Sequence, residues 1–266
     1  MDDFFDSFIN SFVKKSKNFN NKNYANFVLS SKCSSENFCV AIPFDFSNKD
    51  IPVSWNSMHF HSVNVIIFIL CGEGSHIVDD NECVIANNRV FFLNPNQMHT
   101  LRGVKFLKGV GIAFSDGFFS LLQPMLADHI KYEILNRNGN CMYCDIEESK
   151  IPEFIPLLKE MVTETHQDKL YGHYSIMASF LTEFLMKTER YGQWSQDVRR
   201  NINSTSYKTY LDFLSLVEAN FRKKKEIVWY AAELGISTAL LARYVKMYDS
   251  APNHPQTPLK ILNNRI

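Results

Sequence analysis

The sequence predicts an α+β protein in two parts: an N-terminal antiparallel β-barrel with trailing helices, then a small all-α unit with a helix-turn-helix. Between residues 38 and 114, short apolar segments alternate with turn residues at a spacing of about 8–12 residues, which is typical of a sandwich or barrel. After Asp116 the apolar residues recur at helical spacing. A polar stretch over 191–206 then separates the second part.

Length and composition fit this division. The chain has 266 residues, 45% of them hydrophobic and 21% charged, which suits one large or two ordinary folded domains. We expect residues 1–190 to form the first domain, 191–206 a linker and 207–266 the second domain. The start lacks a signal peptide, and the longest apolar run, Val65–Cys71, is far shorter than the roughly 20 residues of a membrane helix. We therefore expect a soluble, cytoplasmic protein.

Six segments are expected to form the strands of the barrel. Each is apolar or β-branched, and most are bounded by Gly, Asn, Asp or Pro. The longest of them is apolar enough to be a buried strand, and Gly72-Glu-Gly74 is expected to turn the chain after it. The six segments are Phe38–Ile42, Val63–Leu70, Ser75–Val78, Glu82–Ala86, Arg89–Leu93 and Gly109–Phe114.

Helical periodicity is found at Phe5–Phe12, around 118–125, at Pro152–His166 and at Tyr174–Arg190. The last two helices each carry an apolar stripe along one face. These stripes can lie on the barrel, or the helices near 153–190 can pair with a second copy of the chain as a homodimer.

The six cysteines are expected to be free thiols, because no secretion signal points to an oxidising compartment. Cys141 and Cys144 form a single Cys-x-x-Cys pair, with no second pair and no nearby histidine at zinc-finger spacing. We therefore expect two incidental cysteines in a surface turn.

The helix-turn-helix is predicted between residues 207 and 248. A first helix over 207–221 is followed by two shorter ones. Ala231 is small enough to let helices approach closely, Gly235 can take the left-handed conformation at a helix end, and Ser237 is placed to cap the next helix. Leu241 and Val245 would bury the inner face of that last helix.

The outer face of the last helix suits the major groove of double-stranded DNA, where Arg can bond guanine and Lys a base or phosphate. That face carries Thr238, Ala239, Ala242, Arg243 and Lys246. The basic run Arg222, Lys223, Lys224 and Lys225 could hold backbone phosphates. From Arg199 onward there are 11 Lys and Arg against 5 Asp and Glu, while the rest of the chain is acidic. An ordinary helical hairpin with a solvated basic face is the alternative.

The segment FLSLVEANFRKKKEIVWYAAELGISTALLARYVK resembles the first of two helix-turn-helix units in bacterial transcription regulators of the AraC type. It carries their A-x-x-L-G-I-S turn and L-x-R-x-x-K helix. HFHSVNVIIFILCGEGSHIVDD and FFLNPNQMHTL are similar to the cupin-like sensor domain of the same family. The resemblance implies a ligand-responsive regulator with a small-molecule effector, a DNA target and no enzymatic activity.

One part of the family pattern is not matched. AraC-type regulators follow the first unit with a linker helix and a second helix-turn-helix, whereas residues 247–266 form a Pro-rich segment. A truncated product and a protein with one unit per subunit both fit. A single unit buries little surface and binds DNA weakly, and dimerisation through the helices near 153–190 would partly compensate.

The histidines of the predicted barrel point to a ligand pocket. In cupins that bind metal, a His-x-His pair alternates on one strand, so that both rings face inward. His59 and His61 resemble this pair, and His99 follows at a plausible spacing for a third. Metal-binding cupins add a carboxylate where this chain has Val65 and Ile66, so three imidazoles would be left to hold zinc or iron. We expect ligand contacts rather than a metal, and no cofactor. The expected contacts are His59, His61, His76, Arg89 and His99.

Two other functions remain open. A cupin-fold, metal-dependent enzyme would contain stoichiometric iron or manganese. A ligand-binding module that no longer binds DNA would account for the unmatched second unit.

Overall fold

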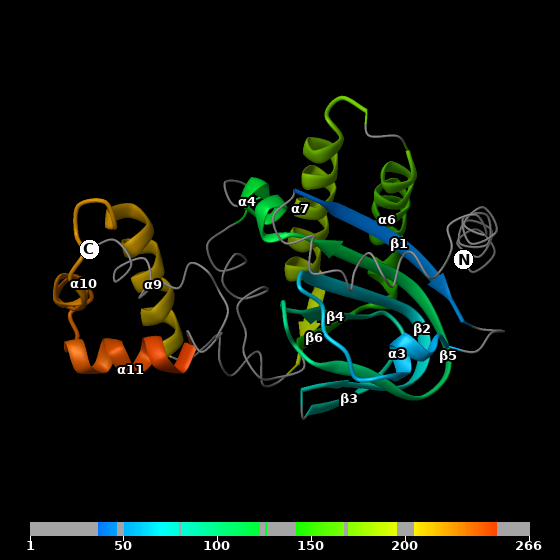
Figure 1. Cartoon of the computed structure of the whole chain (residues 1–266), viewed down its shortest axis with the longest axis horizontal. Helices are drawn as coiled ribbons and strands as arrows, with labels where there is room; N and C mark the ends of the chain where they lie inside the picture. Colours follow the sequence, from blue (N-terminus) through cyan, green and yellow to red (C-terminus); the bar gives the residue numbers. More distant parts are fainter. Residues whose placement is uncertain are drawn as a thin grey trace. The chain divides into compact units, whose positions relative to one another are not determined.

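The computed structural model describes residues 37–46, 51–79, 81–122, 126, 142–167, 170–195 and 205–248 (Figure 1). These fall into two compact units, the first ending at Ser195 and the second holding the described residues 205–248. The helix expected at Phe5–Phe12 lies outside the described residues. None of the described helices is both long enough and apolar enough to cross a membrane.

An antiparallel sheet forms the first unit. Among the described residues its strand order is β1-β5-β2-β4-β6-β7, with β3 also paired to β2. Its central strand β2 pairs with β5 along most of its length, with β4 through its first half and with β3 through its second half. The strands are β1 (Cys39–Asp45), β2 (Asn64–Val78), β3 (Asn81–Ile85), β4 (Arg89–Leu93), β5 (His99–Phe114), β6 (Met142–Ile146) and β7 (Gly192–Trp194). The sheet curls around its apolar inner side (Figure 1), and the predicted α+β fold class is confirmed.

The predicted turn at Gly72-Glu-Gly74 is wrong, because β2 runs through it without a break. The register of β2 against β5 shifts between Ile69 and Cys71 and again between Glu73 and Ser75, so Gly74 lies at a bulge of one long strand. Gly74 has φ +145°, and a Cβ atom there would lie 2.7 Å from the Cα atom of Val104. The glycine is needed because β5 approaches closely. β5 itself begins at His99 rather than at Gly109.

Two helices, α6 (Ile151–His166) and α7 (His173–Tyr191), cover the outer side of the sheet (Figure 1). They pack on each other, and α6 also contacts β1 while α7 contacts β6. Phe68 of β2, Phe154 of α6 and Phe184 of α7 are fully buried and meet edge to face, with ring centroids 5.6–6.1 Å apart. The apolar stripes of both helices therefore lie on the sheet and on each other. Shorter elements of this unit are α3 (Val53–Asn56), α4 (Asp116–Leu122) and the 3₁₀ helix η4 (Glu148–Lys150).

The end of the sheet differs from expectation. Cys144 lies in β6 with its side chain fully buried, so its predicted place in a surface turn is wrong; Cys141 lies outside the described residues. β7 pairs with β6, although its three residues belong to the segment expected to be a linker.

The second unit consists, in its described residues, of α9 (Thr205–Asn220), α10 (Ile227–Glu233) and α11 (Thr238–Tyr248). Within it, α11 runs across α9 (Figure 1). Phe213, Tyr230 and Leu241, one from each helix, are fully buried at its centre. The Tyr230 hydroxyl donates a hydrogen bond of 2.7 Å to the Lys224 carbonyl, which ties the loop before α10 to the core.

Candidate functional site

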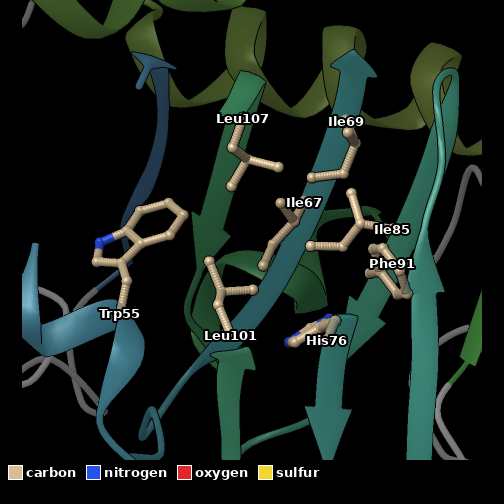
Figure 2. Close-up of a pocket in the computed structure, with 8 residues that line it drawn as sticks. All are labelled: Trp55, Ile67, Ile69, His76, Ile85, Phe91, Leu101 and Leu107. Atoms are coloured by element: carbon tan, nitrogen blue, oxygen red, sulfur yellow. The ribbon is translucent and has the colours of Figure 1, made fainter. Parts of the chain in front are cut away.

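The inner side of the sheet encloses an apolar cavity, shown in Figure 2. Its volume is about 10 Å³, close to the room that one water molecule needs. His76 is the one titratable side chain in the lining, and its ring meets the Phe91 ring edge to face at 4.7 Å between centroids. The lining residues are Trp55, Ile67, Ile69, His76, Ile85, Phe91, Leu101 and Leu107.

Three further histidines gather beside His76. His99 opens β5 and exchanges two backbone hydrogen bonds with His59, of 3.0 and 2.7 Å. Ring centroids lie 4.1 Å apart for His59 and His99, 4.8 Å for His61 and His99, and 5.0 Å for His59 and His61. Phe60, between the two histidines, is half exposed. Four of the five predicted ligand contacts thus lie together.

Hydrogen bonds constrain the protonation of these rings. His59 Nδ1 lies 2.8 Å from the Ser57 carbonyl oxygen, which can only accept, so Nδ1 carries a proton, and in the neutral tautomer Nε2 is the acceptor. His76 Nε2 lies 3.0 Å from His99 Nδ1.

Burial keeps the two inner rings neutral. Burial, followed by the charges of His59 and His61, lowers the pKa of His76 to about 3. Burial and the neighbouring histidines also lower the pKa of His99 well below its usual value. Both imidazoles therefore carry no charge at neutral pH.

The fifth predicted contact, Arg89, lies apart from these histidines in the hydrogen-bond network. Its Nε and Nη2 atoms donate to the Asp145 carboxylate at 2.6 and 2.8 Å, and Nη1 donates to the Val84 carbonyl at 2.6 Å. The guanidinium also lies 4.0 Å above the centroid of the Tyr143 ring. Arg89 thus ties β4 to β6, and a ligand that bound its guanidinium would have to compete with Asp145.

The apolar lining was not predicted from the sequence. Ile67 and Ile69 alternate along β2, as residues of an inward face do, and this signal was available. Trp55 gives no such signal, because α3 is a single short turn whose contact with β5 is distant in sequence.

Residues 54–104 match the family model described as the AraC-like ligand binding domain. This part of the chain is similar to the ligand-binding domain of AraC-like proteins. It contains all four clustered histidines and every residue of the cavity lining except Leu107. The resemblance to AraC-type regulators is therefore confirmed for the sensor part.

Comparison with solved structures gives remote likenesses. The structure of wild-type ToxT from Vibrio cholerae with a bound unsaturated fatty acid is 12% identical with a TM-score of 0.37, over 86% of this chain and 78% of that chain. The AraC-like transcriptional activator CuxR is 11% identical with a TM-score of 0.34, over 85% and 72%. A comparison with curated protein sequences gives no match.

The turn between α10 and α11, where the helix-turn-helix was predicted, is the second candidate site. Gly235, with φ +65°, ends α10 in the left-handed conformation, as predicted. The Ser237 hydroxyl accepts a hydrogen bond of 3.2 Å from the Leu240 backbone N–H and so caps α11, also as predicted. Leu241 and Val245 are fully buried, and Ala231 is nearly so. The inner face of α11 is therefore fixed by packing against α9 and α10.

The opposite face of α11 is exposed to solvent. Ala239, Ala242 and Arg243 are exposed, and Thr238 is half-buried. Lys246 belongs to α11, but its side chain lies outside the described residues. The basic run is exposed at all four positions, Arg222, Lys223, Lys224 and Lys225.

Proposed function

We propose that this chain is a ligand-responsive, DNA-binding transcription regulator of the AraC type and not an enzyme, acting in the cytoplasm. The observation that carries the proposal is the order of its parts: residues 54–104 match the AraC-like ligand binding domain, and they are followed by two helices, α10 and α11, joined by a short capped turn. In this arrangement the sensor receives a small molecule and the helical unit contacts double-stranded DNA.

DNA binding is supported by the exposed face of α11. Small residues at Ala239 and Ala242 let the helix backbone approach base edges, and Arg243 stands beside them as the donor suited to guanine. The exposed run Arg222–Lys225 supplies positive charge for phosphates at the turn before α10. Thr238 and Lys246 complete the proposed contact set.

Effector binding is proposed at the cavity and the adjoining histidines. His59, His61, His76 and His99 would supply polar contacts, with Arg89 available where a ligand competes with Asp145. Because the cavity now has room for about one water molecule, a larger effector must move lining side chains. That requirement makes the bound and free sensor different, which is the condition for a ligand to shift an equilibrium between two states.

Homodimerisation is proposed through the helices near 153–190. On α7, Ile176 and Met186 remain about two-fifths exposed and fall on one side of the helix. Sedimentation of the full chain tests this, with Ile176→Glu expected to shift a dimer towards monomer.

Fluorescence anisotropy tests DNA binding. The full chain is titrated into a labelled duplex of random sequence across a salt series. Affinity should fall steeply with salt, and Lys223→Ala with Lys224→Ala should reduce the slope by about two, one for each phosphate contact. Arg102→Ala, an exposed arginine on β5 of the first unit, is the matched control and should change nothing.

Sequence reading is tested separately on duplexes enriched from the random pool. There Arg243→Ala should cost about 1–3 kcal/mol. Absence of binding at low salt would refute the DNA-binding proposal and favour a ligand-binding module that does not bind DNA.

A further inference from the structure

We propose that His59, His61 and His99 form a binding site for a divalent transition-metal ion of the zinc class, with His76 as a positioning residue behind His99. This goes beyond the proposed function and does not depend on DNA binding. It also revises the expectation, drawn from the missing carboxylate, that these rings only contact a ligand.

The first support is the convergence of three ligand atoms. One nitrogen of each ring can be chosen so that all three lie within 4.8 Å of one another. Around a tetrahedral zinc ion with Zn–N bonds of about 2.0–2.1 Å, ligand nitrogens are roughly 3.3 Å apart. The rings therefore need to approach by up to about 1.5 Å, a shift within reach of side-chain rotation for the half-buried His59 and His61.

The second support is an unpartnered nitrogen on a buried ring. His99 is 4% exposed, and its Nε2 atom has no hydrogen-bond partner in the described structure. A buried polar atom without a partner destabilises the folded state. The Nδ1 atom of the same ring is already engaged by His76, so only a group that enters the cluster can satisfy Nε2.

The third support is that two of the rings are held by hydrogen bonds at Nδ1. His59 donates from Nδ1 to the Ser57 carbonyl, which leaves the Nε2 lone pair available. When His99 donates from Nδ1 to His76 Nε2, its own Nε2 likewise carries a lone pair. Metal-binding histidines typically donate their second ring nitrogen to a carbonyl or similar acceptor in this way.

The arrangement also fits the chain's topology. His59 is held to His99 by two backbone hydrogen bonds, so the two segments that carry the proposed metal ligands cannot separate without breaking these bonds. His76 enters from β2, which pairs with β5 directly beside His99. Three protein nitrogens leave a fourth position open for water or a small donor molecule.

Metal titration of the purified full chain tests the proposal. After dialysis against a chelator, Zn²⁺ is added and followed by calorimetry, and Co²⁺ is added and followed by visible absorption. We expect one ion per chain, and a cobalt spectrum of nitrogen and oxygen ligands without a thiolate band. His59→Ala and His61→Ala should each weaken binding by more than the roughly 10–100-fold that loss of an outer partner costs. His166→Ala, a histidine on α6, is the control and should bind as the unaltered chain does.

The role of His76 has its own comparison. His76→Leu removes the acceptor behind His99 and should weaken Zn²⁺ binding about 10–100-fold, whereas His76→Gln keeps an acceptor and should restore part of it. Far-ultraviolet circular dichroism checks that each variant is folded, and either of the two alanine variants suffices if the other is not.

Three results would overturn the site. The first is no stoichiometric binding by the chelator-treated chain. The second is Zn²⁺ affinity unchanged in a folded His59→Ala or His61→Ala variant. The third is a cobalt spectrum dominated by thiolate, which would place the ion on cysteines instead.

Discussion

Replacing Gly235 by alanine should destabilise the second, helical unit through the backbone alone. Gly235 has φ +65°, and a Cβ atom added there would meet no atom within 4 Å. The cost is therefore that of the left-handed conformation for an L-residue, about 1–2 kcal/mol. Alanine also restricts the unfolded chain, which offsets about 0.4–1 kcal/mol of this. We expect a net loss of about 1 kcal/mol.

Hydrogen exchange measured by mass spectrometry can assign that loss to one unit. A loss of about 1 kcal/mol should speed the exchange of protected amides in 227–245 roughly fivefold. Gly235→Asn should have a smaller effect, because asparagine tolerates the left-handed region better than alanine does.

Gly103 provides a matched control in the first unit. Its φ is +60° and a Cβ atom there would also meet nothing within 4 Å. Gly103→Ala should therefore speed exchange in β2 and β5 by a similar factor and leave 227–245 unchanged. If Gly235→Ala left exchange in 227–245 unaltered while Gly103→Ala acted as expected, the inferred role of the left-handed turn would be refuted.

Three further predictions concern the first unit. Phe184→Ala should lower the free energy of unfolding in urea by about 3–5 kcal/mol, and a loss below about 1 kcal/mol would show that the aromatic contacts with Phe68 and Phe154 do not hold the helices. Asp145→Asn should cost only about 1 kcal/mol, since its side chain is 42% exposed, and less at high salt; a cost independent of salt would contradict an ionic contribution. Burial raises the pKa of the Cys39 and Cys144 thiols, so raising the pH from 7 to 9 should not make them react with iodoacetamide before the unit unfolds; peptide mapping that found either one modified in the folded chain would contradict this.

In the helical unit, the turn between α10 and α11 and the cap of α11 were predictable from the sequence. Gly235 and Ser237 each act through neighbours within a few residues, so their types and spacing sufficed to predict the turn and the cap. The helices α6 and α7 were predicted to within about a residue at each end for the same reason, because their apolar stripes repeat locally.

Pairing between distant strands was not predictable. Gly72 and Gly74 look like a turn in the sequence, whereas β2 continues through them because it pairs with β5 before and after this segment. The first half of β5 contains Gly103 and two charged residues, Arg102 and Lys105, so its apolar pattern is weak, and pairing with β2 makes it a strand.

In the candidate site, too, features set by nearby residues were predictable, and features set by strand pairing were not. The His-x-His motif and His99 identified the cluster. The bond between His76 and His99, however, depends on the register of β2 against β5. Arg89 was expected to contact a ligand, whereas it binds Asp145. This ion pair was not predictable, because Asp145 is 56 residues away in a strand that the sequence did not suggest.

The alternation of side chains along β2 has a mechanical consequence. Ile67 and Ile69 line the cavity, whereas Phe68 between them points the opposite way, against Phe154 and Phe184. A single peptide layer is thus all that divides the space where an effector would sit from the two long helices behind it. Protein interiors are close-packed, so a ligand that displaces Ile67 and Ile69 would also displace Phe68. A change in the cavity would in this way be transmitted to α6 and α7.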